Sequence, residues 1–346
     1  MVKSTVLGYG GYYSSGGSVI RDIFKEFSPR FDVPNEFRLI KERGGLLDLD
    51  YAINKDMSPE NIGLAVNEFL WITKQLSRKS TRFGKAGFSY GEFTNNQFLD
   101  LTSKYINSIT DYYYPMNWHY HTFKKSYLRQ MIEKILVKIF IRNKRILKGS
   151  YSYPLISLNE EYFIKKTIFY LEDIFSSIRK YRRISDDYPV GLHNIVYNFN
   201  PNILKRVKTF IPNLRLFIVD RDPRDIYLNL VKDSYSRYLP KNTMGIKKAE
   251  CFIRFFKSIR IHKDEISKMN NVFIYQFEDF CFNYEQTLSK LLLDSKLDSI
   301  NHKNKNQFFD SLKSQKNIGQ WKSVKKNVLP EIKKIEKELE KYLINI

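Results

Sequence analysis

The sequence predicts an α/β fold with a central, mostly parallel sheet flanked by helices and a helical insertion in the middle of the chain. A short apolar run from Thr5 to Leu7 leads into a loop of glycines and serines, and an amphipathic segment begins at Val19. Two later runs, 214–220 and 272–277, are continuous apolar strands of the kind buried in parallel sheets. Helical segments separate these runs, and strands that alternate with helices are typical of a parallel sheet.

The loop after the first strand is typical of an anion-binding turn. From Gly11 it reads GYYSSGGS, which overlays the nucleotide-binding pattern G-x-x-x-x-G-K-[ST] except that Gly17 takes the place of the lysine. Backbone N–H groups at a helix start carry partial positive charge, and glycines allow them to approach a phosphate or sulfate closely. The sequence therefore predicts a P-loop-like fold with an anion site at this turn, and leaves the anion open.

The remaining strands place several polar residues at one edge of the sheet. A short strand is expected from about Phe37 to an end near Lys41 and Glu42, and 189–199 has the composition of a buried strand. Glu42, His193 and Arg221 then follow strand ends, as the glycine loop does. Ligands of parallel sheets lie at the carboxyl ends of the strands, so we expect these residues to converge.

Apolar residues at helical spacing predict helices at about 18–28, 59–78, 127–147, 160–182, from 284 onwards and 330–343. The aromatic-rich stretch 92–148 is expected to be helical. Its segment 127–147 has a basic outer face and is expected to pack on the core, with a membrane-surface helix as the alternative. We expect one domain over 1–346, in which 50–185 is a largely helical insertion.

Composition limits the class of protein. The chain has 346 residues, of which 42% are hydrophobic, so it can bury a sizeable core. No apolar run approaches the roughly 20 residues needed to cross a bilayer, and the first strand begins too early to leave room for a signal peptide. Cys251 and Cys281 lie in apolar contexts, and the five histidines have no metal-ligand spacing. We therefore expect a cytoplasmic protein without a metal.

Charge favours anionic partners. The net charge is +21, from 58 Lys and Arg against 37 Asp and Glu. A bias toward Lys and Asn in the composition is the simpler explanation. Basic residues are spread along the chain and no nucleic-acid-binding motif occurs, so no nucleic acid partner is expected. Peripheral contact with a membrane or a lipid-linked glycan stays open, as does the oligomeric state.

Three motifs, in this order, resemble those of sulfotransferases that use 3′-phosphoadenosine 5′-phosphosulfate (PAPS). They are YSSGGS at 13–18, LFIVDRDPRDIYLNL at 216–230 and NIGQWKS at 317–323. The stretch 273–292 also resembles the family's strand and helix with an acidic pair. The resemblance spans nearly the whole chain, except the middle at about 50–185. It implies PAPS as co-substrate and transfer of a sulfuryl group to an acceptor hydroxyl or amine.

The resemblance also implies which residues hold the donor. The 5′-phosphosulfate would lie at the loop residues Ser14, Ser15, Gly16, Gly17 and Ser18. The 3′-phosphate would lie at Arg221 and Asn229, with Lys316 before the late glycine and Arg224 as a further candidate. Arginine forms charge-assisted, bidentate bonds to phosphate, which suits this role. Asp225 is expected to be structural.

The chain departs from the family pattern in three places. Before the late glycine, the family's basic residues are reduced to Lys316. Ser14 replaces the loop lysine that stabilises charge on the sulfuryl group, so another cation must act there; Lys41 and Arg38 are the candidates. Asn229 replaces the family's serine, although an amide can still donate to a phosphate oxygen.

The family's catalytic base is either a glutamate near the end of the second strand or a histidine on the strand before the arginine turn. Glu42 and His193 are the matching candidates, ahead of His119 and His121. The long aromatic and basic middle region, about 50–185, favours a sugar acceptor, in particular a surface polysaccharide precursor. Small alcohols, phenols and lipid-linked glycans are the alternatives.

A P-loop-type kinase or NTPase is the competing interpretation. The strand 214–220 ends in Asp220, and an aspartate in that position holds Mg²⁺ in those enzymes. The missing loop lysine argues against this class. A nucleic-acid-binding module driven by charge alone is the third interpretation.

Overall fold

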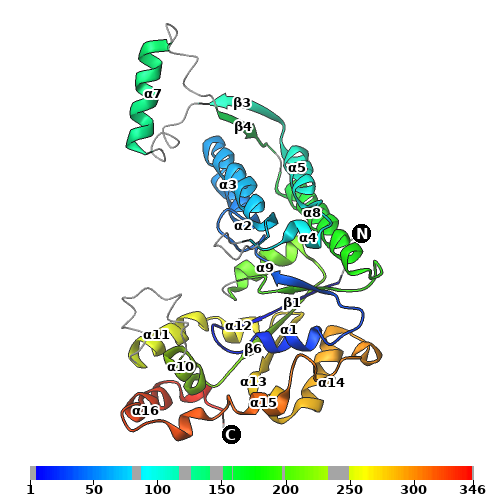
Figure 1. Cartoon of the computed structure of the whole chain (residues 1–346), viewed down its shortest axis with the longest axis vertical. Coiled ribbons are helices and arrows are strands. Elements are labelled where there is room, and N and C mark those ends of the chain that lie inside the picture. The colour runs from blue at the N-terminus through cyan, green and yellow to red at the C-terminus, as the bar shows by residue number, and fades with distance from the viewer. Residues whose placement is uncertain are drawn as a thin grey trace.

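The centre of the molecule is a five-stranded parallel sheet with the strand order β2-β5-β1-β6-β7. Figure 1 labels two of its strands, β1 and β6, between the two groups of helices. The computed structural model describes residues 5–79, 87–116, 126–140, 151–157, 159–196, 199–232 and 249–344. The strands of this sheet are β1 (Val6–Gly11), β2 (Asp32–Glu36), β5 (Val190–His193), β6 (Leu214–Asp220) and β7 (Val272–Gln276). The predicted α/β class with a parallel sheet is confirmed.

Strand β6 shows how the two faces of the sheet are covered. Leu216 and Ile218 belong to one buried cluster, and Phe217 and Val219 belong to another, because successive side chains of a strand point to opposite faces. Both faces are therefore buried, which explains why the strand is apolar throughout.

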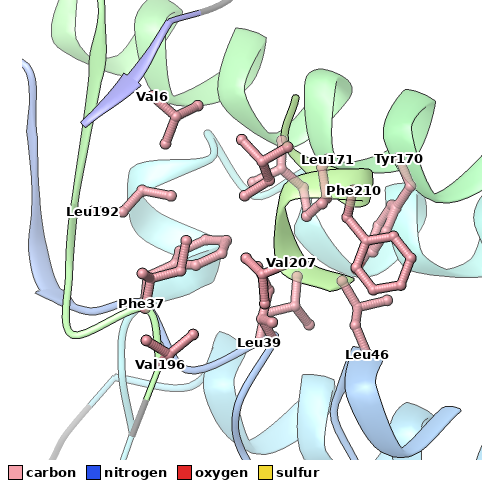
Figure 2. Close-up of a cluster of buried hydrophobic side chains, with 14 of the residues drawn as sticks. Val6, Phe37, Leu39, Leu46, Tyr170, Leu171, Leu192, Val196, Val207 and Phe210 are labelled. Atoms are coloured by element: carbon pink, nitrogen blue, oxygen red, sulfur yellow. The ribbon is translucent and has the colours of Figure 1, made fainter. Parts of the chain in front are cut away.

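The first cluster lies under the larger group of helices. These are α2 (Leu46–Tyr51), α3 (Pro59–Ser77), α4 (Tyr90–Phe93), α5 (Phe98–Ile109), α8 (Glu160–Arg182) and α9 (Pro201–Phe210), with a π-helical turn at Ala52–Asp56. Figure 2 shows part of this cluster, in which Val6, Leu192, Leu171 and Val207 come from two strands and two helices. Helix α8 occupies the predicted range, because its apolar side recurs over six turns.

The second cluster lies under helices from the two ends of the chain. These are α1 (Ser18–Phe24), α13 (Phe277–Phe282) and α14 (Tyr284–Ser295). A third cluster joins α10 (Pro223–Lys232), α11 (Ala249–Ile259) and α16 (Leu329–Glu338). The short elements nearby are α12 (Lys263–Ile266), α15 (Ser311–Gln315) and 3₁₀ turns at Ser299–Asn301, Gln320–Ser323 and Glu340–Tyr342.

The expectation of a strand from about Phe37 to near Glu42 is wrong. Strand β2 ends at Glu36, and the residues after it form a turn in which Leu46 N donates to Leu39 O at 2.9 Å. Leu39 and Ile40 are fully buried in this turn, so their apolar character reflects burial and not a strand. The true strand contains Pro34, which is tolerated because β2 is at the edge of the sheet.

The stretch 92–148 is not helical throughout. Strand β3 (Tyr112–Met116) pairs antiparallel with β4 (Tyr151–Leu155), and this two-stranded arm contacts α3 through β4 and leads toward α7 in Figure 1. Helix α7 (Tyr127–Phe140) lies beyond the arm. The expectation that this helix packs on the core is wrong, since its apolar residues Leu128 and Ile132 are exposed.

Candidate functional site

The glycine loop lies between β1 and α1 and is held by the neighbouring strand β6. Ser15 Oγ donates to the carbonyl oxygen of Val219 at 2.6 Å, and Tyr12 N donates to the same oxygen at 3.2 Å. The Ser15 side chain is buried, so its hydroxyl anchors the loop. Ser14 adopts a left-handed conformation with φ of 58°, and Ser18 is exposed at the start of α1.

Two glycines of the loop have no room for a side chain. A Cβ on Gly17 would lie 2.5 Å from the backbone C of Gly10 and N of Gly11. Gly16 has φ of +86°, and its Cβ would lie 2.6 Å from the ring of Phe277. The position that the nucleotide-binding pattern gives to lysine is therefore closed to any side chain, which argues against a P-loop kinase or NTPase.

The loop and the arginine turn share one cavity of about 540 Å³. Gly16, Ser18, Arg221 and Asn229 all contribute to its lining, as the sequence predicts. The rest of the wall comes from α1, from the start of α13 and from a late segment of the chain, namely Val19, Asp22, Phe277, Asn306, Gln307, Phe308, Phe309, Asp310, Lys313, Ser314 and Asn317. Lys316 is exposed and does not line the cavity, whereas Lys313 of the same segment does.

Arg221 is the buried cation of this cavity. Its side chain lies over the ring of Phe277, with Cζ 4.8 Å from the ring centroid, and Nη2 donates to the carbonyl of Asn317. Its Nε atom is buried, and no described residue accepts a hydrogen bond from it. Burial lowers the pKa of Arg221, although the carboxylates of Asp225 and Glu278 oppose this effect. A buried guanidinium with a donor left over is suited to bind an anion.

The neighbouring Arg224 has a different role. It forms two bonds to Asp222, with Nε–Oδ1 at 3.0 Å and Nη2–Oδ2 at 2.7 Å, and Nη1 donates to Glu336 at 3.0 Å. Its guanidinium lies 3.5 Å from the centroid of the Trp321 ring. Arg224 is therefore engaged by protein partners, and its assignment as a phosphate ligand is not supported by its contacts.

Asp225 is structural, as expected. It accepts hydrogen bonds from the backbone N–H groups of Gly319 and Gln320, at 2.8 and 3.0 Å. Ile344 N donates to Asp222 Oδ2 at 3.0 Å. These contacts fix the NIGQWKS segment and the residues after it against the arginine turn.

Two further carboxylates lie beneath the turn. Asp220 receives Arg260 Nη2 and Lys263 Nζ, each at 2.6 Å, so its oxygens are engaged by cations. This arrangement does not suit a Mg²⁺ ligand. Glu278 accepts from Asp222 N at 3.0 Å with Oε1, and its buried Oε2 has no partner among the described residues. Burial raises the pKa of Glu278 to about 7.

His193 ends strand β5 next to the loop. It is buried and stacks on Tyr9, with ring centroids 5.6 Å apart. Burial and the nearby Arg21 lower its pKa to about 4, so the imidazole is neutral at physiological pH. In the sheet, His193 pairs in register with Glu36, the last residue of β2. A glutamate at the end of the second strand therefore lies beside His193, and it is Glu36.

Glu36 is surrounded by donors. It accepts from Asn194 Nδ2 at 3.0 Å and from Arg38 Nη2 at 2.8 Å, and Lys41 Nζ lies 3.6 Å away. Burial raises the pKa of Glu36, but these neighbours outweigh it and the pKa is lowered overall. The Lys41 side chain is only 3% exposed, and burial lowers its pKa to about 8.

Glu42 lies on a second cavity, of about 390 Å³. Arg38 joins the two glutamates, since its Nη1 is 2.6 Å from Glu42 Oε2 and its Nη2 contacts Glu36. This cavity is mostly apolar, and its lining consists of Glu42, Trp71, Ile72, Gln75, Leu76, Arg78 and Phe88. His119 and His121 lie outside the described residues.

In the described ranges, no group of three or more His, Cys, Asp or Glu residues could hold a metal ion. No described helix combines the length and the apolarity needed to cross a bilayer.

Comparisons with known proteins add one finding. No protein-family model matches the chain, and no curated protein matches it. The solved structure of sulfotransferase STF9 from Mycobacterium avium aligns with 99% of this chain and 76% of that chain, at 11% identity and a TM-score of 0.37.

Sequence reasoning missed Glu36, Lys313 and Phe277. Glu36 ends a proline-containing edge strand that has no apolar alternation. Phe277 directly follows strand β7, so its place at the carboxyl edge of the sheet could have been predicted. Nothing in the local pattern distinguishes Lys313 from Lys316.

Proposed function

We propose that this chain is a PAPS-dependent sulfotransferase that acts on a hydroxyl or amine of a sugar, in particular of a surface polysaccharide precursor. The observation that carries the proposal is the cavity in which the glycine loop meets the buried Arg221 with its unpartnered Nε. The motif resemblance supports PAPS as the anion, and the position of Arg221 in the cavity supports its binding there.

The donor carries two anionic ends, and the cavity offers groups for both. Gly16 and Ser18 line it from the loop, where any side chain at Gly16 would collide with Phe277. Arg221 and Asn229 line it from the arginine turn and α10. The volume of about 540 Å³ is within the range of about 300–1,000 Å³ that small-ligand pockets have.

Sulfuryl transfer needs a base and a positive field. When bound, PAPS supplies an electrophilic sulfur, whose bond to the acceptor oxygen or nitrogen forms as its bond to the phosphate oxygen breaks and the electron pair leaves with 3′-phosphoadenosine 5′-phosphate. The neutral His193 takes the acceptor proton on a ring nitrogen, and Glu36 stabilises the imidazolium. Lys41 and Arg38 supply positive charge in place of the missing loop lysine.

The cavity at Glu42 is our candidate for the acceptor. Trp71 is 61% exposed at its wall and offers a ring face, while Glu42, Gln75 and Arg78 offer polar groups at the edge. Sugar rings present C–H surfaces to aromatic faces and hydroxyls to polar side chains. In this assignment Glu42 orients the acceptor, and His193 removes its proton.

Calorimetric titration with 3′-phosphoadenosine 5′-phosphate, and with ATP–Mg²⁺ in parallel, tests the donor site. Arg221→Ala should lose about 2 kcal/mol or more of binding free energy, about thirtyfold in Kd, and Arg221→Lys should lose less. Lys313→Ala should weaken binding several-fold, and the matched Lys316→Ala should leave it unchanged. Preference for ATP–Mg²⁺, or equal binding by wild type and Arg221→Ala, would overturn the proposal.

Transfer of labelled sulfate from PAPS to a mixture of glycans tests the chemistry. His193→Asn should abolish transfer and retain binding of the bisphosphate, because the base acts only on the acceptor. Trp71→Ala should raise the KM for the glycan with little effect on donor binding. Full activity of His193→Asn would assign the base elsewhere, with Glu36→Gln and Glu42→Gln as the next variants.

A further inference from the structure

Helix α7 carries an apolar face that is open to solvent. Leu128, Met131, Ile132 and Ile135 are spaced i, i+3, i+4 and i+7, so they share one side of the helix. Their exposed fractions are 70, 43, 50 and 47%, and Tyr127 beside them is 78% exposed. Contiguous exposed apolar surface of this kind marks a site of interaction.

No other described element packs extensively on this helix. In Figure 1, α7 lies at the far end of the β3–β4 arm, away from the sheet and its helices. The described part of the chain therefore does not cover these five large side chains. Whatever buries them must come from outside that part.

The charge around the helix limits the choice of partner. Between residues 124 and 148 the sequence has one acidic residue, Glu133, and nine basic ones: Lys124, Lys125, Arg129, Lys134, Lys138, Arg142, Lys144, Arg145 and Lys148. Arg129 and Lys134 are exposed on α7 itself. An apolar face flanked by Lys and Arg is the pattern of a helix that lies in the interface of an anionic membrane.

A second copy of the chain fits this surface less well. A stable protein interface uses about 20–30 residues on each side, whereas the described side chains of α7 include five large exposed apolar ones. Two copies would also bring together the same basic segment, in a chain of net charge +21.

We propose that α7 docks the protein on the surface of a bilayer that contains anionic lipids, with Leu128, Met131, Ile132 and Ile135 inserted at the level of the headgroups. The inference depends only on the exposed face and its charge, so it stands or falls independently of the sulfotransferase proposal.

Sedimentation of the full chain with lipid vesicles tests the inference. The protein should bind vesicles of phosphatidylcholine mixed with phosphatidylglycerol, bind phosphatidylcholine alone at least tenfold more weakly, and dissociate as salt is raised. The double variant L128Q/I132Q should lose at least tenfold in partitioning. The matched double variant L293Q/I300Q, which changes two exposed apolar residues on another part of the molecule, should bind as wild type does.

Two results would overturn the inference. One is the absence of binding to anionic vesicles, or binding that L128Q/I132Q leaves unchanged. The other is a dimer in sedimentation equilibrium that L128Q/I132Q dissociates, which would assign the face to a second copy. Because both substitutions replace exposed side chains, circular dichroism of the variant should match wild type, and binding of 3′-phosphoadenosine 5′-phosphate should be retained wherever wild type binds it.

Discussion

Replacing Glu278 with glutamine should stabilise the protein at alkaline pH and leave its stability unchanged in acid. The carboxyl is 3% exposed, its Oε1 accepts from Asp222 N, and its Oε2 has no partner in the described chain. Burial raises its pKa from the ordinary 4.5 to about 7, and this gap corresponds to about 3 kcal/mol. Between these two pH values the folded state binds more protons than the unfolded state, so the free energy of unfolding of the wild type falls as pH rises.

A glutamine at position 278 still offers an oxygen that accepts the hydrogen bond from Asp222 N, and it carries no charge to be buried. Glu278→Gln should therefore match wild type near pH 4.5 and exceed its free energy of unfolding by up to about 3 kcal/mol at pH 8. Urea unfolding at the two pH values measures the difference, and other titrating groups cancel between the two proteins. Glu285→Gln, which removes one negative charge from an exposed side chain, is the matched control. A Glu278→Gln variant that is less stable than wild type at pH 8, or equally shifted at both pH values, would refute the reasoning.

Three further predictions concern the residues around the site. As pH falls from 6.5 to about 4, the histidine of the unfolded chain takes up a proton while the folded His193 stays neutral, so the free energy of unfolding of the wild type falls. His193→Gln should remove this part of the pH dependence, and urea unfolding across this range measures it. Asp220→Asn should cost about 3–5 kcal/mol in thermal unfolding, since Arg260 would be buried without a counter-charge; a loss below about 1 kcal/mol would contradict this. Gly17→Ala should lower both stability, by about 1–3 kcal/mol, and affinity for the bisphosphate, because its Cβ meets backbone; unchanged calorimetric binding would show that the loop can adjust.

The hydrophobic pattern predicted the ranges of those helices and strands in which buried residues recur with one regular spacing along the whole element. Strand β6 and helix α8 occupy the expected ranges, since one is buried on both faces and the other has one long apolar side. The pattern failed at Leu39 and Ile40, where apolar residues are buried in a turn. The prediction that α7 packs on the core also failed. An apolar stripe on a helix indicates that this face is suited to burial, but it does not say whether the protein's own core or another surface buries it.

At the candidate site, the sequence indicated several of the residues that line the cavity. Gly16 and Arg221 line one cavity, because each follows the carboxyl end of a strand; Asn229 of α10, which the motif resemblance indicated, lines the same cavity. Sequence reasoning could not predict that Ser15 is held by Val219, 204 residues away in the sequence. Nor did it consider Glu36, because the end of β2 at Glu36 and its pairing with His193 become visible only in the folded sheet.

The attachment of the late segment to the arginine turn has a consequence for synthesis. Asp225 accepts hydrogen bonds from the backbone N–H groups of Gly319 and Gln320, and Asp222 accepts one from Ile344 N. A chain emerging from the ribosome presents the glycine loop and the arginine turn long before these partners are translated, and domains generally fold from the N-terminal side first. Residues 306–317 supply part of the cavity wall, so the cavity is completed only after this segment has emerged, and the glycine loop and the arginine turn are made before the rest of the pocket that they line.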